Sequence, residues 1–126
     1  MKRTYDYDEL ARQVRHIVKN EKVYRQMNYS REDLAKRLDV PNYIVSKLMK
    51  TKMNYSLLDY LNLHRVKYAH SILTAPRVNR HTVEEVSEMA GFTCRMTFYR
   101  AYWKFYGYAP GQERKNAQEK AENEAE

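Results

Sequence analysis

The chain has 126 residues, of which 43% are hydrophobic and 31% charged, a balance typical of one folded domain or two very small ones. It contains 23 Lys and Arg against 16 Asp and Glu, and the resulting net charge of +7 favours a polyanionic partner. Its apolar runs are too short for a membrane span and its first residues are not a secretory signal, so we expect a cytoplasmic protein without membrane contact.

The composition favours an all-α fold without a metal or cofactor. Only three Gly and three Pro interrupt a sequence rich in Leu, Met, Ala, Lys, Arg and Glu, which are good helix formers. Cys94 is the single cysteine, which excludes an internal disulfide, and the four histidines are scattered rather than set at metal-ligand spacing. The sequence also lacks a glycine-rich phosphate loop, an HExxH motif and a nucleophile elbow, so we expect neither an enzyme nor a small-molecule site.

The first predicted helix covers residues 6 to about 22, with Asp6 or Asp8 as its N-cap. Its apolar residues recur at i, i+4, i+7 and i+8, which indicates a packing helix with the buried residues Leu10, Val14, Ile17 and Val18.

Residues 30–54 predict two short helices joined by a turn. Ser30 and Asp33 form a capping box for a helix that ends at Asp39. Pro41 suits the first position of the next helix, which Asn54 would end because asparagine tolerates a left-handed conformation. That second helix buries Val45, Leu48 and Met49, and its residues pointing away from the core are Asn42, Tyr43, Ser46, Lys47 and Lys50.

A longer helix follows, from a cap at Ser56 and Asp59 to about Thr74. Its apolar direction rotates by roughly 100° between its first and second halves, which a helix serving one core would not need. We infer that it links two subdomains. The first half presents Leu57, Leu58, Tyr60 and Leu61, and the second half presents Val66, Ala69, Ile72 and Leu73.

Residues 82–110 predict a second pair of short helices, hinged at Gly91 and closed at Gly107. Thr82 and Glu85 would cap the first helix. The second helix would bury Phe98, Tyr102 and Phe105, and the opposite arc is basic and polar, as the major groove of DNA accepts. For this helix alone, a solvated basic face is the simpler interpretation. The residues on the arc are Arg95, Met96, Tyr99, Arg100 and Lys104.

The two helix pairs form an internal repeat. Ser30 aligns with Thr82 and Asp39 with Gly91 at an offset of 52 residues, and one extra residue in the second turn makes the offset 53 for the second helices. Ser46 and Lys47 then align with Tyr99 and Arg100. Two such helices on one linker could enter successive major-groove segments, roughly 34 Å apart. Residues 1–116 have a net charge of +10, because the last ten residues hold four Glu against one Lys, and they would neutralise phosphates.

With these motifs in place, residues 7–115 resemble the DNA-binding domain of AraC/XylS-type transcriptional regulators. The most specific match is VEEVSEMAGFTCRMTFYRAYWKFYGYAP, supported in the first half by Leu34-Ala35 and Ser46-Lys47-Leu48. The resemblance implies about seven helices in two homeodomain-like helix-turn-helix subdomains, with the third and sixth helices in the major groove. We divide the chain into subdomains 1–55 and 76–116, a linker helix 56–75 and a disordered acidic tail 117–126.

The resemblance also implies roles for individual residues and partners. Thr93 and Lys104 would be phosphate contacts. The residues that would contact bases or phosphates are Asn42, Tyr43, Ser46 and Lys47 of the first outward face and Arg95, Met96, Tyr99 and Arg100 of the second. The partner is double-stranded DNA, with RNA polymerase and a separate sensor or signalling domain as further candidates. The chain departs from the family at Trp103, where lysine is usual, and at Glu113, where an aromatic residue normally helps to anchor the last helix. Asp39 and Asn54 replace glycines.

A second interpretation is a helical adaptor that binds another protein through Trp103, Tyr106 and Tyr108, because twelve tyrosines exceed what a small core needs. Salt-sensitive DNA binding distinguishes the two interpretations, since an adaptor would not show it.

Overall fold

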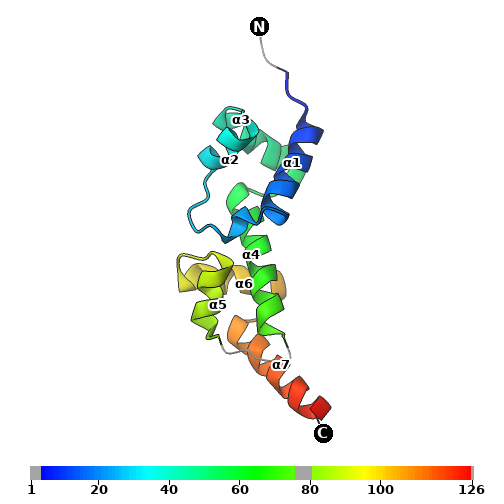
Figure 1. Cartoon of the computed structure of the whole chain (residues 1–126), viewed down its shortest axis with the longest axis vertical. Helices are drawn as coiled ribbons and strands as arrows, with labels where there is room; N and C mark the ends of the chain where they lie inside the picture. The colour runs from blue at the N-terminus through cyan, green and yellow to red at the C-terminus, as the bar shows by residue number, and fades with distance from the viewer. Residues whose placement is uncertain (1–3, 76–80, 126) are drawn as a thin grey trace. The chain divides into compact units, whose positions relative to one another are not determined.

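A computed structural model of the chain describes residues 4–75 and 81–125 and confirms the all-α fold. Within those residues it contains helices and no strand (Figure 1). In chain order the elements are α1 (Tyr7–Lys19), the 3-10 turn η1 (Val23–Arg25), α2 (Arg31–Leu38), α3 (Asn42–Leu48), the π-helical turn η2 (Met49–Met53), α4 (Leu57–Leu73), α5 (Val83–Ala90), α6 (Arg95–Tyr106) and α7 (Pro110–Ala125).

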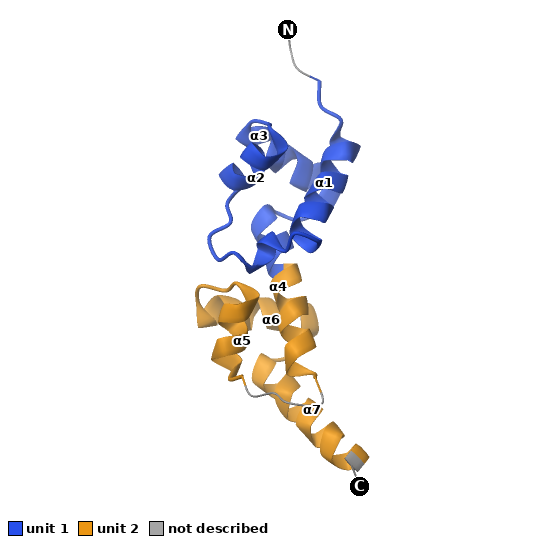
Figure 2. Cartoon of the chain, in the orientation of Figure 1, with its two compact units in different colours: residues 1–62 blue, residues 63–126 orange. Residues whose placement is uncertain are grey.

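The chain divides into two compact units, Met1–Asn62 and Leu63–Glu126, and the boundary falls within α4 (Figure 2). The linker helix expected over 56–75 therefore contributes its first turns to unit 1 and the remainder to unit 2. The expected start of the second subdomain at residue 76 lies outside the described residues, and the four-part division of the chain stays a prediction.

In unit 1, α1 packs against α3 and η2, and α2 packs against α3. Asp6 caps α1 by accepting a hydrogen bond from the Glu9 amide, and Ser30 with Asp33 forms the predicted capping box of α2. Every apolar position predicted for these helices is buried, while Leu58 of α4 is 61% exposed, contrary to the predicted direction of the first half of that helix. The buried set includes Leu10, Val14, Ile17, Val18, Leu34, Ala35, Leu38, Ile44, Val45, Leu48 and Met49.

In unit 2, the second half of α4 packs with α5 and α6 around one apolar core. The rings of Phe92 and Phe98 lie 5.0 Å apart, and Phe98 meets the Tyr102 ring edge-on. The buried guanidinium of Arg65 lies 5.9 Å from the centre of the Phe92 ring, and burial lowers its pKa. The core consists of Val66, Ala69, Leu73, Val86, Ala90, Phe92, Phe98, Ala101 and Tyr102.

The backbone confirms the internal repeat. Asp39 and Gly91 end α2 and α5 in the left-handed region, with φ of 56° and 102°. The following amides, of Val40 and Phe92, donate to the carbonyls of Ala35 and Ser87, which are equivalent at the offset of 52 residues. The two turns therefore share one C-terminal hydrogen-bond pattern.

The second helix of each pair ends in the same conformation as well. Asn54 follows η2 with φ of 61°, and Gly107 follows α6 with φ of 81°. Pro41, expected at the first helical position, is instead the N-cap of α3, as Cys94 is of α6. Residues 42–53 thus correspond to 95–106, although the last turn is π-helical in unit 1 and α-helical in unit 2.

Helix α7 differs from the sequence expectation. A disordered acidic tail was predicted from residue 117, but the helix continues to Ala125, and residue 126 lies outside the described residues. Residues 117–125 contain three Ala and three Glu with one Gln and one Lys, all good helix formers, and this helix propensity outweighs the self-repulsion of the three glutamates.

Glu113 explains how α7 is held without the usual aromatic residue. Its carboxylate is buried and accepts hydrogen bonds from the hydroxyls of Tyr102, at 3.0 Å, and Tyr108, at 2.8 Å. The Nδ1 atom of His70, on α4, lies 2.6 Å from Glu113 Oε1, and the His70 ring stacks on Tyr106 at 4.3 Å. Burial, then the bond to Glu113, raises the pKa of Tyr102, while the bond to Glu113 chiefly raises that of Tyr108. This polar cluster ties α4, α6 and α7 together.

Asn54→Gly is expected to raise the free energy of unfolding by about 0.5–1 kcal/mol and Asn54→Ala to lower it by about 1 kcal/mol, because the left-handed backbone favours glycine. Urea denaturation followed by circular dichroism measures both. The control is Asn20, the right-handed C-cap of α1, where Asn20→Gly should destabilise. Equal effects of glycine at the two positions would contradict the prediction.

Glu113→Ala is expected to lower the free energy of unfolding by about 2–4 kcal/mol, since it leaves the buried Tyr102 hydroxyl, the partly buried Tyr108 hydroxyl and His70 without their shared acceptor. The matched control is Gln112→Ala: this neighbour is exposed and its side chain donates a hydrogen bond to Asn116 on the helix surface, so its effect should stay within about 0.5 kcal/mol. If the two variants unfold at the same urea concentration, Glu113 does not anchor α7.

Candidate nucleic-acid interface

One side of α3 and η2 carries the polar residues that the sequence predicted to point outward. All five are exposed, and Tyr43 has 65% of its surface accessible. The opposite side is closed by Ile44, Val45 and Leu48, which are buried in unit 1. We call this set the α3 face: Asn42, Tyr43, Ser46, Lys47 and Lys50.

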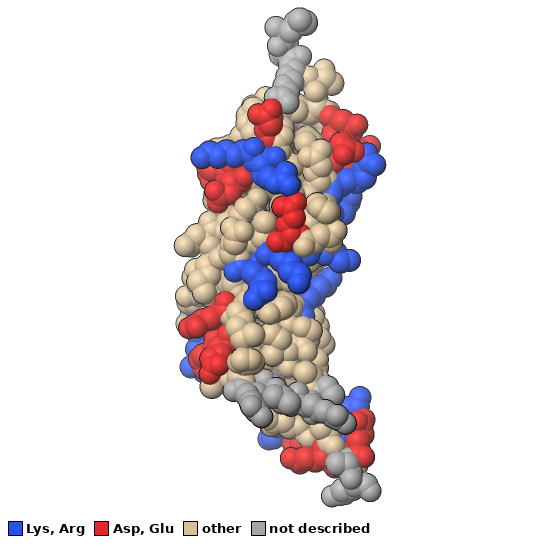
Figure 3. Space-filling model, viewed as in Figure 1, with Lys and Arg blue, Asp and Glu red and all other residues tan. Residues whose placement is uncertain are grey.

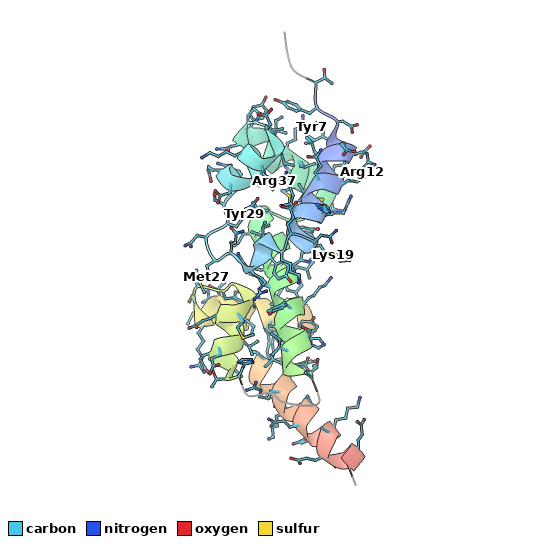
Figure 4. All side chains as sticks on the ribbon, in the orientation of Figure 1. Tyr7, Arg12, Lys19, Met27, Tyr29 and Arg37 are labelled. Carbon is cyan, nitrogen blue, oxygen red and sulfur yellow. The ribbon has the colours of Figure 1, made fainter. Side chains whose placement is uncertain are left out.

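Neighbouring helices hold several of these side chains. Arg31 of α2 donates to the Ser46 hydroxyl at 3.0 Å. Lys47 Nζ lies 5.6 Å from the centre of the Tyr7 ring at the start of α1, whose position Figure 4 shows. In the next turn, Lys52 forms a 2.9 Å ion pair with Asp8, which lowers the pKa of that carboxyl. The first turn of α1 thus contacts two basic side chains after Ser46, those of Lys47 and Lys52.

The corresponding side of α6 presents a second face, defined as Arg95, Met96, Tyr99, Arg100 and Lys104. Four of these residues are exposed, with Met96 at 58%, while Tyr99 is half-buried and meets the Phe98 ring edge-on. Thr93 is exposed in the turn before the helix. The structure thus brings the predicted site residues of unit 2 to one surface, the α6 face and the turn before it.

Arg95 is fixed at the start of α6 by two neighbours. Its guanidinium lies 3.4 Å from the Glu84 carboxylate on α5, and it donates to the Tyr99 hydroxyl at 3.3 Å. The guanidinium also lies 5.2 Å from the Tyr99 ring centre. Glu84 leaves part of the guanidinium open, since the Arg95 side chain is 68% exposed.

The contacts between first and second helices are equivalent in the two units. Glu32 on α2 accepts from Asn42 at 3.5 Å, and Glu84 on α5 pairs with Arg95. Glu32 aligns with Glu84 at the offset of 52, and Asn42 with Arg95 at 53. Sequence reasoning missed these glutamates, as well as Arg31 and Tyr7. The repeat alignment could have predicted the role of the glutamates. It aligns Glu32 with Glu84 on the first helices and the hydrogen-bond donors Asn42 and Arg95 on the second helices.

Charge is not segregated over the whole surface. Figure 3 shows Lys and Arg side chains interspersed with Asp and Glu on the displayed side of the molecule. The case for an interface therefore depends on the α3 and α6 faces, where the exposed charges Lys47, Lys50, Arg95, Arg100 and Lys104 are all positive. Among the described residues, no three His, Cys, Asp or Glu side chains gather as a metal ion would require. No helix in the same part of the chain has the length and apolarity to cross a membrane.

Cys94 lies at the edge of the α6 face, as the exposed N-cap of α6. Its side chain makes no capping hydrogen bond, and the backbone amides of Thr97 and Met96 are its polar neighbours at the helix start. These amides, with smaller effects of the Thr97 hydroxyl and of Arg100, lower the pKa of the thiol.

Two helix-turn-helix units with exposed basic second helices define a DNA-binding class of protein. A family model described as "Helix-turn-helix domain" matches residues 34–116. The chain belongs to this AraC-type family of DNA-binding transcriptional regulator domains.

A curated relative is the Msm operon regulatory protein of Streptococcus mutans, which is 27% identical over 86 residues. The aligned region is 68% of this chain and spans only 30% of that relative's length.

Solved structures share the fold. A protein of unknown function from Listeria innocua superposes with a TM-score of 0.70 at 23% identity, covering 86% of this chain and 97% of that one. The C-terminal domain of AraT, a response regulator from Geobacillus stearothermophilus, gives a TM-score of 0.69 at 23% identity, covering 91% of this chain and 88% of that one. The C-terminal domain of the response regulator yesN from Fusobacterium nucleatum gives a TM-score of 0.66 at 23% identity, covering 81% of this chain and 98% of that one.

The Cys94 thiol of the folded protein is expected to reach half its maximal alkylation rate by iodoacetamide at a pH below the ordinary cysteine value of about 8.5, because the helix start favours the thiolate. Rates measured by mass spectrometry across a pH series test this. The same cysteine in urea-unfolded protein is the control and should return to the ordinary midpoint. Identical midpoints would contradict the assigned effect of α6.

Proposed function

We propose that this chain recognises a specific duplex DNA site by placing α3 and α6 in successive segments of the major groove. The observation that carries the proposal is the equivalence of the α3 and α6 faces. Lys47 and Arg100 occupy the same position of the repeat, and both are exposed. Each lies five residues after a residue that contacts the preceding helix, since Asn42 bonds Glu32 and Arg95 pairs with Glu84. A surface that served only solubility would not need this agreement.

The chemistry of each face suits base and phosphate contacts. The Arg100 guanidinium can bond guanine edges in two places, Asn42 can bond adenine, and Met96 can pack on a thymine methyl group. Lys47, Lys50 and Lys104 would neutralise phosphates, and the hydroxyl of Thr93 would donate to one. We assign Ser46, Tyr43, Arg95 and Tyr99 to the same interface, with Arg95 oriented by Glu84 and Tyr99.

The biological setting is part of the proposal. Two of the similar structures are C-terminal domains of response regulators. By analogy, we propose that this domain acts in the cytoplasm with a separate sensor or signalling domain and contacts RNA polymerase at a promoter. Two of the three aromatic residues assigned to the adaptor alternative make contacts within unit 2, because Tyr106 stacks on His70 and Tyr108 bonds Glu113. They are therefore weaker candidates for binding another protein.

In vitro selection from random duplexes supplies the DNA for the test. Lys47→Ala and Arg100→Ala are each expected to weaken binding to the selected duplex by about 1–3 kcal/mol, roughly 5- to 150-fold, and together to abolish it. Mobility-shift titration measures the affinity, and circular dichroism checks that the variants remain folded.

Lys19→Ala is the matched control, since Lys19 is an exposed lysine on α1, outside both faces (Figure 4). It should lower affinity far less than Lys47→Ala does. The proposal fails if no duplex is enriched by the selection, or if the folded double variant binds as tightly as the original chain.

A further inference from the structure

Helix α6 leaves a tryptophan uncovered. Trp103 is the only tryptophan of the chain, and 60% of its surface is accessible, whereas Phe98 and Tyr102 on the other side of the helix are fully buried. Unit 2 therefore does not use this indole for its core. A single exposed apolar residue is common in proteins and does not by itself indicate a binding site. The position of Trp103 on the helix is the evidence for a function.

Trp103 lies on the same side of α6 as the residues that define the α6 face. At about 100° per residue it is about 20° from Met96 around the helix axis, and it falls between Tyr99 and Arg100. Its neighbours Arg100 and Lys104 are exposed cations. An indole among cations on a groove-facing helix is placed to meet a surface that is both polyanionic and partly apolar, as the sugar-phosphate backbone of DNA is.

The repeat shows what the other unit carries at this position. Trp103 aligns with Lys50 at the offset of 53 residues, in the same way that Arg100 aligns with Lys47. Lys50 is exposed in η2, immediately after α3. One position of the repeated motif therefore presents an ammonium group in unit 1 and an indole in unit 2.

Resting on the proposed function, we propose that Trp103 is a DNA-contacting residue that packs its indole on a deoxyribose and donates Nε1–H to a phosphate, where Lys50 of unit 1 makes an ionic contact. Base edges are contacted mainly from the N-terminal part of a recognition helix. Trp103 comes two turns later, where the helix faces the backbone. Indole has an apolar body and one N–H donor, which suits sugar and phosphate together.

The two contacts differ in their response to salt. A lysine that neutralises a phosphate releases a condensed counterion, which makes the negative slope of log affinity against log salt concentration steeper by about 0.9. A neutral indole releases none. Trp103 therefore contributes affinity that persists as ionic strength rises, whereas the contribution of Lys50 declines.

Salt titrations of four variants on the selected duplex test the proposal. Trp103→Ala should weaken binding about tenfold at every salt concentration with an unchanged slope. Lys50→Ala should reduce the slope by about 0.9, Trp103→Lys should increase it by about 0.9, and Lys50→Trp should reduce it by about 0.9. Circular dichroism of each variant checks the fold.

Trp103 also reports directly on the unmodified protein. Its fluorescence can be excited at wavelengths where tyrosine does not absorb, and acrylamide quenching measures its exposure. The selected duplex should reduce quenching several-fold relative to free protein. A Lys47→Ala/Arg100→Ala double variant at the same DNA concentration is the control and should keep the exposure of free protein.

Two results would overturn the inference: a folded Trp103→Ala variant with unchanged affinity, or a bound complex in which acrylamide quenches Trp103 as in free protein. Either result would show that Trp103 does not contact DNA and would favour a protein-binding role for its exposed side chain. Both are distinct from failure of the proposed function, in which no duplex is selected or the folded Lys47→Ala/Arg100→Ala double variant binds as tightly as the original chain.

Discussion

Each helix-turn-helix unit depends on a chain reversal in the left-handed region of backbone space. Asp39 and Gly91 adopt it between the first and second helix, and the amides that follow them close the same C-terminal hydrogen bonds. A β-branched residue at either position would be strained, and the second helix would leave its direction. The apolar contacts that bury Val45 or Phe98 follow from this turn, as does the exposure of the opposite side.

The second constraint is that α4 serves two cores. Its last turns enter the apolar cluster of unit 2 through Val66, Ala69 and Leu73, while Tyr60 and Leu61 are buried before them. Buried polar residues, Asn62 and Arg65, occupy the stretch where the chain passes from one unit to the other. A continuous helix satisfies its own backbone hydrogen bonds through that stretch, so neither unit must supply partners for them.

Sequence alone predicted the parts of the fold that depend on local rules. The caps at Asp6, Ser30 and Thr82, the left-handed turns, and the buried spacing of Phe98 and Tyr102 all follow from residue type and helical period. The outward residues of both faces were predicted as exposed for the same reason. Their contacts with DNA stay a prediction.

The features that sequence did not predict depend on contacts between distant segments. Glu113 replaces an aromatic residue that normally helps to anchor the last helix, yet it lies in a buried cluster with His70, 43 positions earlier in the chain, and Tyr102. No helical period indicates that meeting. The π-helical turn η2 and the exposure of Leu58 are likewise set by tertiary packing, because their local sequence fits an ordinary amphipathic helix.

The helical state of α7 keeps the acidic C-terminal segment from neutralising the basic residues of α6. A flexible acidic segment could fold back onto the basic face of its own unit and compete with the phosphates of a ligand. In α7 the carboxylates of Glu119 and Glu122 are instead carried on a regular helix that Glu113 fastens at its first turns. Carboxylates held in this way compete poorly with phosphates for the cations of α6. The positive charge of α6 is therefore not neutralised by the acidic segment of the same chain.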